Sequence, residues 1–326
     1  MRQKCEKTDC PAPKGLCLEH ASSDYPKCEH WLGNAAEQDS VQRNTNRANA
    51  KPLPWTGEAL QPADLSLVSE RSAPLIIGMI GGADAGKTSY LGMLYTLLFN
   101  GKTFENWHFA GSYTLAAWET LAQYLKIKPG GVVEFAPPTP SNPDYYSLSH
   151  LALKKSEIFR DVLFADSSGE VFNLWSENTQ DPNAVNARWI YEKANSFIFM
   201  VDCVALIEKR GAAKSSIVQM AEQIVANLDG RPVAIVWSKA DRLDEVRENI
   251  RSALAEDLTE CLSDAHVFEV SNYSKSDPDT LCHKNNLAVT EYLIEKMNEP
   301  SRVKITPAIN QPHDFFFDFK GRHEVA

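Results

Sequence analysis

The sequence predicts an α/β fold in which a doubly wound, mostly parallel sheet carries helices on both faces. Three observations lead to this prediction. The first is that short, solidly apolar segments follow one another along most of the chain, and the second is that helix-length segments separate them. Alternation of this kind is typical of parallel sheets that are buried on both faces. The third observation is a glycine-rich turn at residues 81–88, directly between the first apolar segment and the first helical one.

The first predicted strand, residues 75–80 with the sequence LIIGMI, lies between Pro74 and Gly81 and precedes an apolar helix at 87–99. An insertion at about 101–140 follows. Its first part contains apolar residues at helical spacing, and its later Pro- and Gly-rich stretches interrupt regular structure. The residues at helical spacing are Leu115, Trp118, Leu121, Ala122 and Leu125.

Five more strands are predicted after the insertion. The first two form a pair of neighbouring strands, and helix-length segments separate the other three. The clearest helix among these segments, at 244–262, has a continuous apolar face. The strands are expected at 145–153, 159–166, 196–202, 232–238 and 266–271, and the helix face contains Val246, Ile250, Leu254, Leu258 and Cys261.

The composition is that of an ordinary soluble globular protein. The chain has 326 residues, of which 43% are apolar and 23% charged, and a net charge of −10. Collagen-like and wholly disordered chains are excluded, and the acidic balance argues against a general role in nucleic-acid binding. The longest apolar stretches are far below the ~18 residues of a membrane span. The start, MRQKCEKTDC, lacks the apolar core of a secretory signal, so a cytoplasmic location is expected.

The chain is predicted to contain four regions. Residues 1–31 form a Cys/His-rich module, 32–72 a linker or packing arm, 73–299 the α/β domain, and 300–326 a Phe-rich tail. An aromatic cluster such as that of the tail docks a partner or, more often, packs as an extended arm on its own domain.

The strongest motif is GGADAGKT, a complete G-x-x-x-x-G-K-[ST] that predicts a fold of the P-loop NTPase type. The glycines let backbone N–H groups converge on a β-phosphate, and the helix N-terminus adds a favourable dipole. Lys87 would reach the β- and γ-oxygens, and Thr88 would offer its hydroxyl to Mg²⁺. A glycine turn without nucleotide is the alternative. The predicted phosphate-binding residues are Gly81, Gly82, Ala83, Asp84, Ala85, Gly86, Lys87, Thr88 and Ser89.

Two further motifs follow later strands. In DSSGE, the carboxylate of Asp166 can hold Mg²⁺ and Gly169 can present its N–H to a γ-phosphate, although an ordinary strand-ending turn is the alternative. In SKAD, the carboxylate of Asp241 can accept two hydrogen bonds from guanine, and Lys239 can lay its aliphatic stem along the base. Each motif is weak alone. Both, however, fall at carboxyl ends of predicted strands, where α/β sheets bind ligands.

GGADAGKT, DSSGE and SKAD, in this order, resemble the nucleotide-binding motifs of Ras-like and translation-factor-like GTPases of the TRAFAC class. SNYS places Ser271 and Asn272 where the last loop of these proteins contacts the base. The resemblance implies binding of GTP, GDP and Mg²⁺, with two switch regions that respond to the γ-phosphate. More narrowly, the Cys-rich start, the insertion and the DSSGE turn followed by VFNLW resemble a bacterial group of GTPase-like proteins suspected in conflict or defence systems.

The sequence departs from the GTPase pattern at two positions. Ser238 stands where these GTPases usually have Asn, and a hydroxyl replaces only part of its bridging role between base and phosphate loop. Glu170 stands where a Gln often orients water, and a carboxylate beside the γ-phosphate is unfavourable unless the site compensates its charge. Slow or partner-stimulated hydrolysis is therefore expected, with Lys87, Gly169 and Glu170 as the catalytic residues.

The first switch of such a GTPase needs a Thr that closes over Mg²⁺ before the second strand. Thr139, in the Pro-rich stretch FAPPTPSNP, is the best candidate, and an ordinary loop threonine is the alternative. The predicted Mg²⁺ ligands are therefore Thr88, Asp166 and Thr139.

The first 31 residues offer four cysteines and two histidines, enough for a closed tetrahedral Zn²⁺ site. The preferred ligands are Cys5, Cys10, Cys17 and Cys28, with His20 as a rival fourth ligand. Reduced thiols without metal are the alternative. Because Lys and Arg balance Asp and Glu in this module, a structural or protein-docking role is favoured over nucleic-acid binding.

The leading hypothesis is a GTP-binding switch or slow GTPase that acts on a protein effector or regulator. A P-loop ATPase or phosphotransferase would keep the phosphate-binding residues and make SKAD incidental. A third possibility is a non-hydrolysing interaction protein with nucleotide as a structural ligand.

Overall fold

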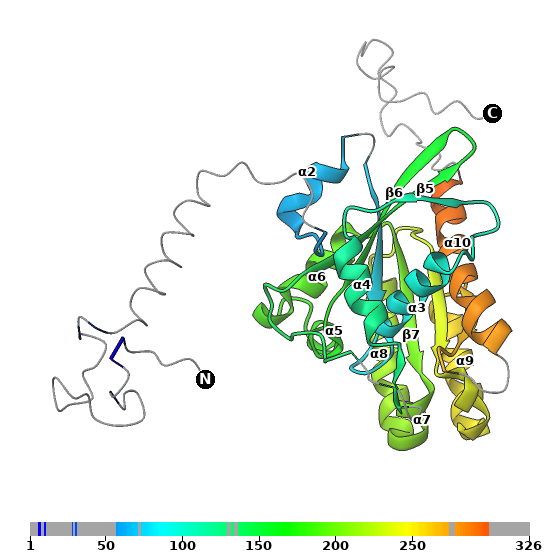
Figure 1. Ribbon diagram of the computed structural model, residues 1–326. Coiled ribbons are helices and arrows are strands. Elements are labelled where there is room, and N and C mark those ends of the chain that lie inside the picture. Colours follow the sequence, from blue (N-terminus) through cyan, green and yellow to red (C-terminus); the bar gives the residue numbers. More distant parts are fainter. Residues whose placement is uncertain are drawn as a thin grey trace, which may run out of the picture. The chain divides into compact units, whose positions relative to one another are not determined.

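The computed structural model describes residues 57–70, 73–128, 132–133, 136–273 and 278–299, together with Glu6, Lys7, Cys10, Cys28 and His30. The chain divides into two compact units, Met1–Pro54 and Trp55–Ala326. The helices and strands that the structure describes all lie in the second unit (Figure 1).

A seven-stranded sheet with the order β2-β5-β6-β1-β7-β8-β9 forms the centre of the second unit. The strands from β6 to β9 in this order are parallel, whereas β5 and β2 add antiparallel pairs at one edge. A small two-stranded sheet pairs β3 with β4. The predicted mostly parallel sheet is thus confirmed. The strands are β1 (Leu75–Ile80), β2 (His108–Gly111), β3 (Ile127–Lys128), β4 (Val132–Val133), β5 (Ser147–Lys155), β6 (Ile158–Asp166), β7 (Ser196–Asp202), β8 (Val233–Ser238) and β9 (His266–Val270).

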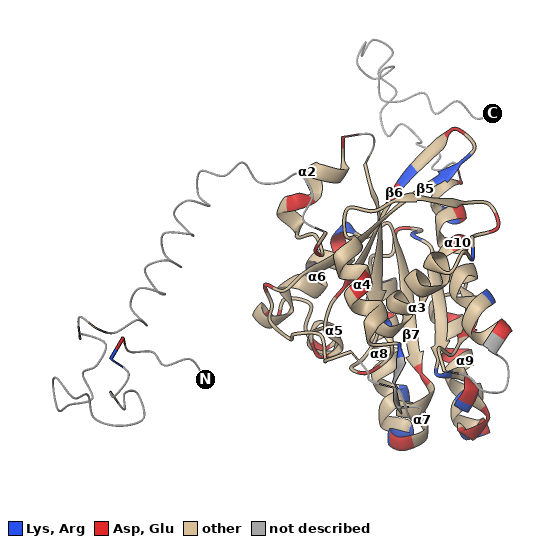
Figure 2. Cartoon of the chain, viewed as in Figure 1, with Lys and Arg blue, Asp and Glu red and all other residues tan. Residues whose placement is uncertain are grey.

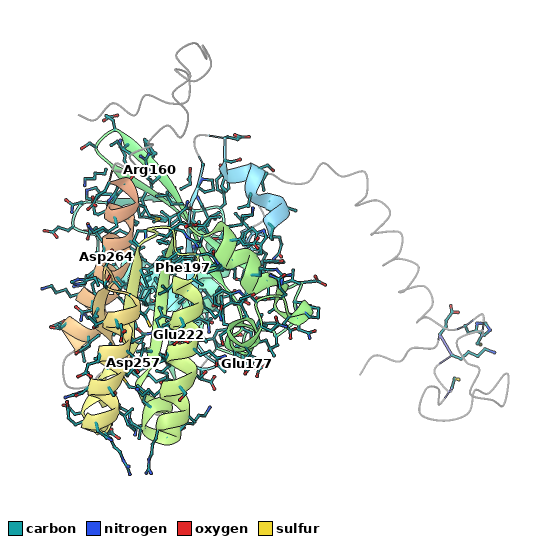
Figure 3. All side chains as sticks on the ribbon, turned by 180° about the vertical axis from the view of Figure 1, so that it is seen from behind. Arg160, Glu177, Phe197, Glu222, Asp257 and Asp264 are labelled. Carbon is teal, nitrogen blue, oxygen red and sulfur yellow. The ribbon has the colours of Figure 1, made fainter. Side chains whose placement is uncertain are left out.

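Helices cover both faces of the sheet, as predicted. One core packs α3, α4 and α10 on the sheet, and the other packs α5 to α9 on its opposite face. Figure 3, seen from behind, shows α8 and α9 over this second face, with Glu222 and Asp257 labelled on them. The helices are α3 (Lys87–Phe99), α4 (Leu115–Gln123), α5 (Gly169–Glu177), α6 (Val185–Lys193), α7 (Cys203–Lys209), α8 (Gly211–Val225), α9 (Glu248–Cys261) and α10 (Asn285–Asn298).

The alternation of side chains along β1 explains why an almost wholly apolar strand forms here. Ile77 and Met79 point into one core, and Ile76 and Ile80 into the other. Because successive side chains of a strand point to opposite faces, a central strand covered on both sides must be apolar throughout. A side chain at Gly78 would collide with its neighbours, since a methyl group there would lie 3.0 Å from the ring of Phe197.

Several predicted elements match the structure closely. The strands at 75–80 and 196–202 and the helix at 87–99 have the observed bounds. The helix predicted at 244–262 starts too early, however, because Ala240–Glu245 forms a 3-10 helix and Val246 is extended, so that α9 begins at Glu248. Strand β2 was not predicted, because its residues are mostly exposed and the segment therefore lacks the pattern of a buried strand.

Residues 57–68 belong to the second unit and pack within it. Leu60 forms an antiparallel bridge with Leu148 of β5, with N–O distances of 2.9 and 3.1 Å. The short helix α2 (Leu65–Val68) follows and buries Val68. In the part of the chain that the structure describes, no helix is both long and apolar enough to cross a membrane.

Candidate functional site

The main cavity of the second unit lies where β1, β8 and β9 end. Its volume of about 650 Å³ is in the range of small-molecule sites. It brings together most of the residues that the motifs predicted. Gly81, Gly82 and Asp166 do not line it, but each accepts a hydrogen bond from a residue that does. The predicted residues that line it are Ala83, Asp84, Ala85, Gly86, Lys87, Thr88, Ser89, Thr139, Gly169, Glu170, Ser238, Lys239, Asp241, Ser271 and Asn272.

The loop between β1 and α3 forms the phosphate end of this cavity. Gly86 precedes the helix with φ of 90°, a left-handed conformation that favours glycine. The loop also approaches β7 closely, since a methyl group at Gly81 would lie 2.9 Å from Cβ of Met200. Because the first N–H groups of a helix have no intrahelical partner, the start of α3 offers donors and a positive dipole to an anion.

Lys87, the first residue of α3, folds back over this loop. Its Nζ donates hydrogen bonds to the carbonyl oxygens of Gly81 and Gly82 at 2.9 and 3.1 Å, and only 6% of the side chain is exposed. Burial lowers the pKa of Lys87, while the charges of Asp166 and Asp84 act in the opposite direction. An anionic phosphate would favour the charged ammonium in this buried position.

Three oxygen-bearing side chains meet beside Lys87. Thr88 Oγ1 donates to Asp166 Oδ2 at 2.8 Å and lies 3.2 Å from Thr139 Oγ1. Burial raises the pKa of Asp166, and its Oδ1 is buried without a hydrogen-bond partner. Hydroxyl and carboxylate oxygens are the donors that Mg²⁺ prefers, usually with waters and substrate phosphates completing the shell. The residues present therefore fit the predicted magnesium.

Gly169 begins α5 and presses directly against the phosphate loop. A methyl group at this position would lie 2.1 Å from the backbone N of Ala83 and 2.2 Å from the carbonyl oxygen of Gly82. The next residue, Glu170, accepts a hydrogen bond from Ser141 Oγ, and Ser141 Oγ is also 3.0 Å from Ser168 Oγ. The carboxylate predicted as a base is thus held by the segment that follows Thr139.

The opposite end of the cavity contains the residues of the predicted base site. Ser271 Oγ donates to Asp241 Oδ1, which fixes the orientation of that carboxylate. Lys239 has φ of 54°, and its Nζ forms an ion pair with Asp202 Oδ2 at 2.8 Å. Ser238 Oγ donates to the carbonyl oxygen of Val201 at 3.4 Å rather than to the phosphate loop.

Asn272 belongs to the same end through a second buried contact. Its Oδ1 accepts a hydrogen bond from Asn286 Nδ2 of α10 at 3.1 Å. The base loop is therefore held by α10, which also accepts a hydrogen bond from Tyr90 of α3 at the carbonyl oxygen of Asn286, at 2.9 Å.

The motifs missed four residues of this network: Ser141, Ser168, Asn186 and Asp202. Asp202 ends β7 and accepts from the backbone N of Val204, so its position at a strand end could have revealed it. Ser168 lies inside the DSSGE motif, which assigned it no role, and Ser141 and Asn186 act through tertiary contacts that no sequence motif marks.

The predicted zinc ligands Cys5, Cys17 and His20 lie outside the described residues. Cys10 and Cys28 are both buried and form no disulfide. A 2.9 Å hydrogen bond from the backbone N of Glu6 to His30 O brings their two segments together. Within the described part of the chain, no three His, Cys, Asp or Glu side chains are grouped to hold a metal ion, so the zinc site stays a prediction.

The sheet order, the loop between β1 and α3 and the carboxylates at strand ends define a P-loop nucleotide-binding protein. The model of the family Double-GTPase 2 matches residues 75–297, and the chain belongs to this family. It is therefore a GTP-binding protein. A comparison with curated proteins finds no match.

Two similar solved structures are Roco2 RocCORdC of Methanosarcina barkeri bound to GDP and a mutation variant of SsGBP. Their sequence identities to this chain are 14% and 15%, and their TM-scores are 0.37 and 0.36. The matches cover 69% and 72% of this chain but only 49% and 60% of the other chains.

The contact of Gly169 with the phosphate loop leads to a prediction about Gly169→Ala. The added methyl group meets backbone atoms, which no side-chain rotation can relieve, so the start of α5 must move away. We expect the nucleotide-free protein to lose about 1–3 kcal/mol of stability, measured by urea unfolding. Hydrogen exchange in α5 should increase.

The matched control for this prediction is Gly82→Ala. A methyl group at Gly82 has only Asn173 Oδ1 near it, at 3.9 Å, so stability and exchange should stay close to those of the wild type. Equal effects of the two substitutions would contradict the close contact.

Proposed function

We propose that this GTP-binding protein uses Mg²⁺ and hydrolyses GTP slowly, so that its nucleotide state regulates a protein partner. The observation that carries the proposal is the convergence of Thr88, Asp166 and Thr139 beside Lys87. When bound there, Mg²⁺ would neutralise charge on the β- and γ-phosphates. Lys87 and the backbone N–H groups of the loop would stabilise the charge that develops as the β–γ bond breaks.

The base end supports a preference for guanine. Ser271 holds Asp241 in one orientation, and a carboxylate can accept both hydrogen bonds from the N1–H and 2-amino groups of guanine. Adenine presents no such pair of donors. The alternative of a P-loop ATPase or phosphotransferase would give this oriented carboxylate no role.

The first test of this preference compares Asp241→Ala with the wild type in equilibrium binding of labelled GTP and ATP. Loss of two charge-assisted hydrogen bonds should weaken GTP binding about 10- to 100-fold and leave ATP binding nearly unchanged. Asp244→Ala is the control, because Asp244 belongs to the same 3-10 helix but is fully exposed. Preferential ATP binding by the wild type would overturn the proposed guanine specificity.

Slow hydrolysis is proposed because the described residues that line the cavity include no arginine that could join Lys87 in stabilising the transition state. Arg242 lines the base end and pairs with Glu245. Arg188, which follows the second predicted switch, donates to the carbonyl oxygen of Thr179 and does not line the cavity. An arginine supplied by a partner would fill this role.

Glu170 is proposed as the residue that activates or orients water. We expect Glu170→Ala to reduce single-turnover GTP hydrolysis by about 10²-fold or more, because general bases contribute by this order. Glu177→Ala, at the exposed end of α5, is the control and should hydrolyse GTP at the wild-type rate. Rapid wild-type hydrolysis that Glu170→Ala leaves unchanged would contradict this role.

A second candidate function is a non-hydrolysing interaction protein. It is favoured by the hydrogen bond from Ser141 Oγ, which occupies Oε2 of the Glu170 carboxylate. If nucleotide binds but single-turnover hydrolysis is absent with and without candidate partners, this function replaces the first.

The zinc module is proposed to stabilise the first unit. The buried cysteines Cys10 and Cys28 support it, because closely placed segments that carry buried thiols suit a structural Zn²⁺ site. Elemental analysis of the full chain should find about one zinc per molecule, and Cys28→Ser should lose it. Cys261→Ser, on α9, is the control and should keep it. Zinc-free wild-type protein would refute the proposal.

Figure 2 shows basic and acidic residues mixed along α7 and α9. Together with the net charge of −10, this supports a protein partner rather than nucleic acid.

A further inference from the structure

One buried amide group connects the two segments that carry the phosphate-end residues. Asn186 lies near the start of α6, and its side chain is fully buried. Its Nδ2 donates to the carbonyl oxygens of Asn142 and Tyr145 at 3.2 and 3.0 Å, and to Ser167 Oγ at 3.0 Å. The first two acceptors follow Thr139 in the chain, whereas Ser167 directly follows Asp166 at the end of β6.

The first segment is anchored by a well-formed turn. The backbone N of Tyr145 donates to the carbonyl oxygen of Asn142 at 3.0 Å, and the backbone N of Asp144 donates to Asn142 Oδ1 at 2.9 Å. Pro143 at the second position favours this turn. Asn186 therefore binds the carbonyl groups of both outer residues of a rigid turn, Asn142 and Tyr145.

The amide of Asn186 has a fixed orientation. Its Oδ1 accepts a hydrogen bond from the backbone N of Ala187 at 2.9 Å, so Nδ2 must face the turn and Ser167. An amide nitrogen has two hydrogens, and here three acceptors lie within bonding distance. At least one hydrogen is shared. Since two acceptors belong to one rigid turn, the bond to Ser167 is the one that can break when the two segments separate.

We propose that Asn186 is a positioning residue that couples the Thr139 segment to the Asp166 turn and thereby favours triphosphate over diphosphate. The inference rests on the proposed Mg²⁺-dependent GTP binding. In the present arrangement Thr139 Oγ1 lies 3.2 Å from Thr88 Oγ1, so the bonds of Asn186 stabilise a closed phosphate end. Both segments would contact a γ-phosphate, which GDP lacks. Weakening the coupling therefore penalises GTP more than GDP.

A second contact also connects the Thr139 segment to the residues that follow Asp166. Ser141 Oγ contacts both Ser168 Oγ and Glu170 Oε2, so the segment after Thr139 also touches the start of α5. Of the two groups that Ser141 contacts, Ser168 is buried but Glu170 is exposed, whereas Asn186 and Ser167 are both fully buried. The buried contact is therefore the one whose loss water cannot replace.

The test measures dissociation constants for Mg²⁺-GDP and a Mg²⁺-bound, non-hydrolysable GTP analogue with the full chain. Ser167→Ala removes only the link between the segments, and Asn186→Asp replaces the donor with an acceptor that faces two carbonyl oxygens. We expect the ratio of analogue affinity to GDP affinity to fall about 3- to 10-fold in Ser167→Ala and at least as much in Asn186→Asp. Ser167→Ala keeps the test valid if Asn186→Asp does not fold.

The matched control is Asn286→Asp. Asn286 is an equally buried amide, but its Nδ2 donates to Asn272 Oδ1 and to the carbonyl oxygen of Cys282 at the base end. Because GDP and GTP share the same base, this variant should weaken the binding of both nucleotides and leave the ratio of their affinities unchanged. If Ser167→Ala has the same ratio of analogue affinity to GDP affinity as the wild type, the proposed coupling through Asn186 is wrong. Failure of the wild type to bind either nucleotide would instead overturn the proposed function on which it rests.

Discussion

The burial of two ionisable groups at one end of the sheet, Lys87 and Asp166, is the physical constraint on which the rest of the fold depends. Burial lowers the pKa of the lysine and raises the pKa of the aspartate, so each charged form is disfavoured in the folded, nucleotide-free protein. At pH values between the ordinary pKa of Asp and that of Lys, the unfolded chain carries both charges. In this pH range the two pKa shifts therefore make the folded, nucleotide-free protein less stable. In the proposed function, an anionic phosphate and Mg²⁺ would supply the missing partners, and ligand binding would then be linked to stability.

The parallel sheet is what brings these charges together. Because β6, β1, β7 and β8 are adjacent and parallel, their carboxyl ends meet at one edge, although they are far apart in the chain. Asp166, Asp202 and Ser238 are the last residues of three of these strands. The apolar cores on both faces fix the register, since a slip by one residue would exchange the two faces of every strand.

The sequence alone predicts the parts of the molecule that local patterns determine. Strand β1, helix α3 and the phosphate loop follow from apolar runs and glycine positions, and the resemblance to GTPases leads to Thr139. The start of α9 at Glu248 could not be read from periodicity, because the preceding 3-10 helix continues the apolar spacing. Nor could Asn186 be found. Two of its three acceptors are backbone carbonyls, which any residue type could supply.

The two ends of the cavity are held by different kinds of contact, and this difference divides their roles. At the base end, Asp241 and Asn272 are each fixed by one dedicated partner, Ser271 and Asn286. In the proposed function, contacts there would serve GDP and GTP alike. At the phosphate end, one amide of Asn186 shares two hydrogens among three acceptors from two segments. When the bond to Ser167 breaks, Nδ2 keeps its two acceptors in the turn, so the free-energy difference between closed and open forms can stay small enough for a γ-phosphate to control.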